Sequence, residues 1–234
     1  MKLYQSGCLV CGQDLVYLAQ NEPQTCVYCG QNFEASCRCL AGHYVCDACH
    51  SLDSNEVIEQ FCIQTDSTDP MAMAVTLMSH PALHMHGPEH HFLVPAVLLA
   101  AYYNQRQPEE KAAKIRQARK RAEKVLGGFC GFYGSCGAGV GAGIFISLVT
   151  NATPLSKLEW KLSNRMTAEC LLTIAEHGGP RCCKRDTYLA VQTAQSFLKD
   201  HFDTSIGTDE PIRCRFSAFN KECLQQECPF FERI

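Results

Sequence analysis

Residues 8–50 read CLVCGQDLVYLAQNEPQTCVYCGQNFEASCRCLAGHYVCDACH, and this stretch decides the fold of the N-terminal part of the chain. It opens with two Cys-x-x-Cys-Gly knuckles, at Cys8/Cys11 and at Cys26/Cys29. A Cys-x-x-Cys sequence can place two sulfurs on one tetrahedral zinc ion, and the glycine after it suits a turn with positive φ. Two knuckles with a hairpin-length spacer between them predict a zinc ribbon.

More metal ligands follow directly after the second knuckle. They are Cys37, Cys39, His43, Cys46 and Cys49. Their spacing resembles the later half of a RING-type or treble-clef finger and offers ligands for a second zinc ion. Two arrangements remain open: two sites in sequence, or a cross-brace in which alternate ligand pairs share an ion. Because closed four-ligand sites leave no position for chemistry, we expect residues 1–52 to form a structural zinc module that docks a partner.

The composition limits the classes of protein that the chain can belong to. Of its 234 residues, 46% are hydrophobic and 19% are charged, which is enough for a buried core and argues against disorder. The net charge of −3 gives no general attraction to nucleic acid or to an acidic membrane. The apolar run Ile144–Val149 is too short to span a bilayer. The first residues also lack the apolar region of a secretion signal.

We therefore expect a cytoplasmic protein with no membrane partner, in a compartment where thiols stay reduced. The odd number of cysteines, 17, also fits poorly with a complete disulfide framework.

From residue 53 onward the sequence is typical of helices, so the predicted fold class is mostly α. A helical domain over residues 53–234 would follow the small zinc-ribbon or treble-clef-like β module. The predicted helices start near Ser54, Asp69, Pro88, Pro108, Pro154 and Arg185. Asp69-Pro70, for example, combines an N-cap with proline at the first helical position. A cysteine-rich tail from about residue 206 is expected to fold back onto this domain.

The second half of the chain contains further cysteines that could bind a cofactor. They are Cys130, Cys136, Cys182, Cys183, Cys214, Cys223 and Cys228. Cys228 precedes a proline, as in many iron–sulfur ligand runs, so we expect an iron–sulfur cluster. Zinc is the rival, because four cysteines serve both metals. The alternative is that Cys182 or Cys183 is a buried small apolar residue, although the neighbouring Lys184-Arg185 would favour thiolates.

Two other segments suggest a site. Residues 130–143, CGFYGSCGAGVGAG, place Cys136 at the entrance of a helix, where free amides stabilise a thiolate. Their glycines would let a cluster, a phosphate or another helix approach closely. Residues 84–91, HMHGPEHH, offer His86, Glu89 and His90 as acid–base groups or ligands, and with Cys136 they are the predicted catalytic residues. The alternative is a solvated loop.

Seven basic residues crowd the helix predicted after Pro108. They are Lys111, Lys114, Arg116, Arg119, Lys120, Arg121 and Lys124. Beside a zinc module they could follow a phosphate backbone. Since charge runs are usually solvated helix faces, we expect that simpler role.

These motifs resemble an uncharacterised cysteine-rich domain family of anaerobic bacteria and archaea. The resemblance is carried by the N-terminal Cys-x-x-Cys module, His86–His90, Cys136–Ala138, Pro180–Arg185 and Cys228-Pro229. It spans nearly the whole chain, and because some relatives are joined to methyltransferase-like domains, it implies one-carbon or sulfur chemistry. Cys136-Gly137-Ala138-x-x-Gly141 also resembles the signature of a small redox-active family with a Gly-Cys-Ala-x-x-Gly motif.

The sequence thus favours an iron–sulfur redox or sulfur-handling protein of an anaerobic cytosol. We expect residues 84–91, the loop 130–143 and Cys182-Cys183 to converge on one pocket. Its substrate would be an unknown small molecule or a redox partner protein. A non-enzymatic zinc-folded adaptor for nucleic acid or protein is one alternative, and a metallochaperone or sulfur carrier is another.

Overall fold

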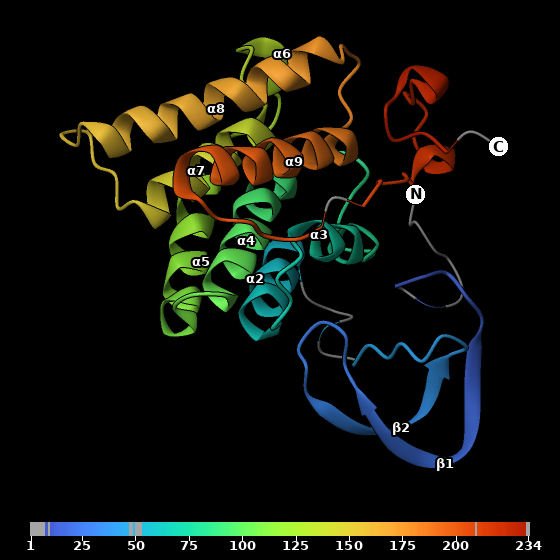
Figure 1. The fold of residues 1–234 in the computed structure, drawn as a ribbon. Coiled ribbons are helices and arrows are strands. Elements are labelled where there is room, and N and C mark those ends of the chain that lie inside the picture. Colours follow the sequence, from blue (N-terminus) through green and yellow to red (C-terminus); the bar gives the residue numbers. More distant parts are fainter. Residues whose placement is uncertain (1–7, 9, 47–48, 50–52, 209, 233–234) are drawn as a thin grey trace.

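The computed structural model describes residues 8, 10–46, 49, 53–208 and 210–232. A two-stranded hairpin module stands at one end of a helical body (Figure 1). Strand β1, Leu15–Thr25, pairs antiparallel with β2, Asn32–Cys39, and the register shifts between Tyr17 and Glu22. After β2 the chain returns to the second knuckle, where Cys26 forms a parallel bridge with Tyr44.

The body consists of helices joined by short loops. They are α2 (Ser54–Gln64), α3 (Pro70–Met78), α4 (Glu89–Asn104), α5 (Pro108–Ala122), α6 (Phe129–Phe132), α7 (Gly137–Val149), α8 (Leu158–Glu176) and α9 (Cys183–Phe202). Two short 3-10 turns, Ser217–Phe219 and Gln225–Glu227, lie in the tail. The predicted fold class, mostly α with a small N-terminal β module, is confirmed.

Local capping signals explain the starts of α2 and α3. The side chain of Asp53 accepts from the Glu56 amide at the start of α2, and Asp69 caps α3 with Pro70 in the first turn. The helix predicted near Pro154 starts instead at Leu158, and the one predicted at Arg185 starts at Cys183.

Helix α4 forms the centre of the body. It is apolar on nearly all sides, and most of its residues are buried against α2, α3, α5, α7 and α9. It continues through Pro95, whose missing N–H leaves the carbonyl of His91 without its helical partner. Among the described residues, no helix is long and apolar enough to cross a membrane.

Glycines of α7 let two neighbouring helices approach it. A Cβ on Gly141 would lie 2.8 Å from the His91 carbonyl oxygen of α4, and one on Gly143 would collide with Thr167 of α8. The sequence allowed a cluster, a phosphate or another helix beside this glycine-rich stretch. In the structure its neighbours are helices α4 and α8.

The tail returns to the N-terminal end of α9. After α9 the chain runs back along the body, and its last segment ends beside the start of that helix (Figure 1). The Gly207 amide donates to the Thr68 carbonyl, and the ring of Phe230 packs edge-on against Tyr188 of α9. Tail cysteines are thereby brought to the Cys182-Cys183 pair.

Candidate metal centres

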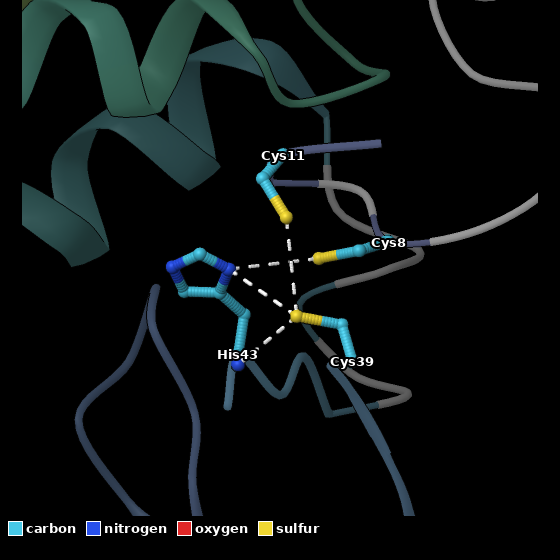
Figure 2. Close-up of side chains that lie close together, drawn as sticks. All are labelled: Cys8, Cys11, Cys39 and His43. Atoms are coloured by element: carbon cyan, nitrogen blue, oxygen red, sulfur yellow. Dashed lines mark hydrogen bonds between the residues drawn. The ribbon is translucent and has the colours of Figure 1, made fainter. Parts of the chain in front are cut away.

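Two groups of four side chains in the N-terminal module could each hold a metal ion. The first is Cys8, Cys11, Cys39 and His43, and the second is Cys26, Cys29, Cys46 and Cys49. Within each group all ligand atoms lie within 4.8 Å of one another. Figure 2 shows the first group, whose side chains point toward a common centre.

The distances in the first group match a single tetrahedral ion. The sulfurs of Cys11 and Cys39 are 3.9 Å apart, and His43 Nδ1 lies 3.8 Å from the Cys8 sulfur and 3.4 Å from the Cys39 sulfur. An ion that binds thiolates at about 2.3 Å in a tetrahedron holds its sulfurs ~3.8 Å apart. The geometry therefore needs little adjustment to accept a metal.

Backbone amides donate hydrogen bonds to some of these sulfurs and so favour their thiolate form. Burial opposes ionisation of Cys26, but amides including that of Cys46 outweigh it and lower its pKa. Burial raises the pKa of Cys8 to about 11, with neighbouring cysteines adding to the effect. Crowded thiols do not all lose their protons without a cation among them, and a bound metal ion would supply that charge.

The hairpin determines which ligand pairs meet. Cys39 ends β2 opposite Leu15 of β1, so it lies near the first knuckle. The Cys26–Tyr44 bridge then brings the following residues to the second knuckle, where the Cys46 amide donates to the Cys26 sulfur. Alternate pairs share a site, which is the cross-brace.

Of the two arrangements that the sequence left open, the structure shows the cross-brace and not two sites in sequence, because Cys8/Cys11 and Cys26/Cys29 belong to different groups. The predicted ligand Cys37 lies in neither group; it sits within β2, opposite Tyr17.

Four cysteines line one pocket between the start of α9 and the tail. They are Cys182, Cys214, Cys223 and Cys228. Apolar side chains, among them Met85 and Phe230, complete the wall. We call this the tail-cysteine pocket.

The tail-cysteine pocket differs from the two N-terminal groups in the spacing of its sulfurs. Its members are in neither of the groups whose ligand atoms lie within 4.8 Å of one another. Amide donors still point at its sulfurs: the Phe216 amide reaches Cys214 at 3.4 Å, and Asn220 Nδ2 reaches Cys182 at 3.5 Å. Burial, followed by the other three thiols, raises the pKa of Cys214 to about 11.

Cys130 and Cys136 line a second pocket, together with Arg181, Arg185 and Asp186. Arg185 also borders the tail-cysteine pocket, so the predicted convergence on one pocket becomes two pockets that share this residue. The expected thiolate at Cys136 is not favoured, because burial and the nearby Asp186 carboxylate raise its pKa to about 12. The two amides at the start of α7 offset this only in part.

Cys183 lines neither pocket, and burial raises the pKa of its thiol to about 11 despite the neighbouring cations.

None of the predicted acid–base groups lines the tail-cysteine pocket, but His86 contacts Asn220, which does. Its Nε2 lies 3.1 Å from Asn220 Oδ1, and the same asparagine donates to Cys182. Glu89 is buried and accepts from the His84 amide at 2.8 Å. His90 is also buried, with Nδ1 3.2 Å from the Gly87 carbonyl oxygen. These two groups brace the start of α4.

Two residues that the sequence did not single out as ligands or catalysts join this region. Asn220 forms hydrogen bonds with both His86 and Cys182, and no sequence motif predicts this role. Lys184 is fully buried behind the pocket. Burial lowers its pKa to about 8, while negative charge on Glu89 and on nearby thiolates acts in the opposite direction.

The basic helix α5 uses several of its charges inside the molecule. The buried Lys111 donates to the Thr65 carbonyl and to Asn104, each at 2.7 Å. Arg119 pairs with Glu59 of α2 at 3.2 Å. These bonds fasten α5 to its neighbours and leave less positive charge for a phosphate backbone than the sequence suggests.

A protein-family profile matches residues 58–231, about three quarters of the chain. The chain belongs to this family. It is described as a family of unknown function, DUF5714. No curated protein and no solved structure was found to be similar to the chain. The DUF5714 region contains the whole tail-cysteine pocket, whereas both N-terminal groups lie outside it.

Proposed function

We propose that this DUF5714 protein is an iron–sulfur redox or sulfur-handling protein of an anaerobic cytosol. Cys182, Cys214, Cys223 and Cys228 would hold one four-iron cluster, and the cross-braced N-terminal module would hold two structural zinc ions. When bound, such a cluster exchanges one electron at a time, at a potential set by charge, hydrogen bonds and exposure. An unknown small molecule or a redox partner protein would donate the electron to the cluster or accept it.

The observation that carries the proposal is the spacing of the four pocket sulfurs. A single zinc ion draws four sulfurs together, as in the N-terminal groups. In a four-iron cluster each cysteine binds a different iron, so the ligand sulfurs stand further apart around a larger body. Four half-buried cysteines around a shared pocket, outside the single-ion spacing, suit the cluster better.

The surroundings of the sulfurs support the same choice. Amides of Phe216 and Gln225 donate to Cys214 and Cys223, each at 3.4 Å. Donors of this kind stabilise the thiolates and the sulfur-rich cluster that they would hold. The largely apolar wall limits access of water, which would protect the cluster.

The chain's own groups could supply a proton beside the cluster. His86 reaches Cys182 through Asn220, and its Nε2 also lies 3.4 Å from Glu222. We propose His86 as the proton-carrying group and assign no such role to Glu89 or His90, which are bonded within the body. Cys136 would face a small molecule bound in the neighbouring pocket.

Anaerobic purification tests the proposed function. We expect about four irons and four sulfides per chain and a broad visible absorption. Cys214→Ser and Cys228→Ser should each lose most of the iron, because each removes a cluster ligand. Cys130→Ser, which changes a half-buried cysteine in the other pocket, is the matched control and should retain it. A colourless chain with a third zinc ion would contradict the proposal.

A further inference from the structure

We propose that Lys184 is the buried counter-charge of the iron–sulfur site and raises its reduction potential. This inference rests on the proposed function, because it concerns the same tail-cysteine pocket. It assigns a positioning role to a residue that does not itself bind the cluster.

Lys184 lies directly behind the pocket. It is in the first turn of α9, two residues after Cys182, and its side chain is fully buried. Its Nζ lies 5.1 Å from the ring centre of Phe216, a residue of the pocket wall. On the other side Nζ donates to the carbonyl of Met78, the last residue of α3, at 3.3 Å. The amine is thus held between a helix C-terminus and the cysteines.

The partners of Lys184 are too few for a buried cation. In the described part of the chain, the Met78 carbonyl is its one hydrogen-bond acceptor, and no carboxylate oxygen lies within 4.0 Å of Nζ. The buried Lys111, by contrast, has two oxygen acceptors at 2.7 Å. The charge of Glu89 acts on Nζ only from beyond 4.0 Å. A buried ammonium with no carboxylate in contact is costly, since the ion loses its hydration and regains little of that energy.

A loaded cluster would add its negative charge to that of Glu89. Four thiolates outweigh the positive charge of an iron–sulfur core, so the complete site is anionic. It becomes more negative when it gains an electron. A fixed positive charge behind the wall therefore favours the reduced state and raises the reduction potential.

The same reasoning predicts opposite effects in the iron-free and loaded chains. Lys184→Met keeps an unbranched side chain that is one atom shorter and removes its charge. In the iron-free chain it removes a buried charge that has no carboxylate in contact, so the melting temperature should rise. In the loaded chain it removes the counter-charge, so the potential should shift to a more negative value and the cluster should be lost more readily to a chelator.

The experiment compares wild type, Lys184→Met and Lys111→Met in both states. Midpoint potentials are taken from the visible spectrum during a redox titration, and melting temperatures from iron-free chains checked by metal analysis. Lys111→Met removes a buried lysine that has oxygen partners, so it should lower the iron-free melting temperature and leave the potential unchanged. Lys184→Arg, which keeps the charge, should restore the potential at least in part.

An unchanged potential in iron-loaded Lys184→Met would overturn the inference and leave the cluster in place. A lower melting temperature of iron-free Lys184→Met, or its failure to fold, would also overturn it, because Lys184 would then be a structural cap of α3. A wild-type chain without iron would overturn the inference and the proposed function together.

Discussion

At the scale of single residues, His90 shows how burial controls a charge. It is almost completely buried, and its Nδ1 donates to the Gly87 carbonyl in the tautomer that this bond requires. Nε2 has no partner among the described residues. Burial, followed by the charge of Lys184, holds the pKa of His90 well below 6.5. The ring is therefore neutral in the folded chain over the physiological range.

This neutral ring predicts a pH dependence of stability. Below pH about 6.5, His90 binds a proton in the unfolded chain but not in the folded chain. The free energy of unfolding therefore falls as the pH falls. The slope from this group approaches about 1.4 kcal/mol per pH unit. Denaturant titrations between pH 5 and 8 should show a shallower slope for His90→Asn than for wild type. Equal slopes in the two chains would contradict the account.

At the scale of elements, the hairpin β1–β2 decides which metal ligands meet. The identity of most ligands could be predicted from the sequence, because the Cys-x-x-Cys spacing is local. Their pairing could not, because it depends on the register that sets Cys39 opposite Leu15 and on the bridge from Cys26 to Tyr44. The sequence predicts Cys37 as a ligand for the same reason, since its spacing alone does not distinguish it from Cys39.

Metal counts of double variants test the cross-brace. Cys11→Ser and Cys39→Ser act on the same site, so each alone and both together should lower the zinc content from two ions to one. Cys11→Ser with Cys29→Ser acts on both sites and should abolish zinc binding. Cys37→Ser should keep both ions. If the Cys11/Cys29 double variant retained one zinc, the two knuckles would share an ion and the cross-brace would be wrong.

The glycines of α7 provide a second test at this scale. Alanine at Gly141 would place its Cβ 2.8 Å from both the His91 carbonyl oxygen and Pro95 Cδ. Overpacking costs about 1–3 kcal/mol, whereas replacing a helical glycine by alanine returns roughly 0.5–1 kcal/mol. We expect Gly141→Ala to lower the free energy of unfolding by about 1 kcal/mol.

Gly131→Ala is the control, since a Cβ there meets no atom within 4 Å, and it should be neutral or slightly stabilising. Equal stability of the two variants in thermal unfolding would contradict the close packing of α4 and α7. The sequence already contained these glycines, but only the packing shows that a helix, and no ligand, fills the space beside them.

At the scale of the whole molecule, contacts between distant parts of the chain form the tail-cysteine pocket, which could not be predicted from the sequence. The tail returns to α9 and gathers four cysteines separated by up to 46 positions, from Cys182 to Cys228. From the cysteine content alone, the sequence predicts one large cofactor site in the second half of the chain. Cys130 and Cys136 are separate from that set, because they line the second pocket. Arg185 borders both pockets and forms an ion pair with Asp186.

The two ends of the chain are thereby suited to different tasks. The N-terminal module closes its sites with four ligands each, which favours a structural role. The DUF5714 region holds more widely spaced cysteines around a pocket with a buried cation behind it. Electron transfer or sulfur chemistry would belong to this second part, and the module before it would stabilise the fold or dock a partner.

Mössbauer spectroscopy of the full chain, purified anaerobically after growth on 57Fe, tests the central claim most directly, because it reports how the bound irons are grouped. The account predicts one four-iron cluster per chain, absent from Cys214→Ser. Iron bound as isolated single ions, or a wild-type chain with no iron and a third zinc, would contradict it.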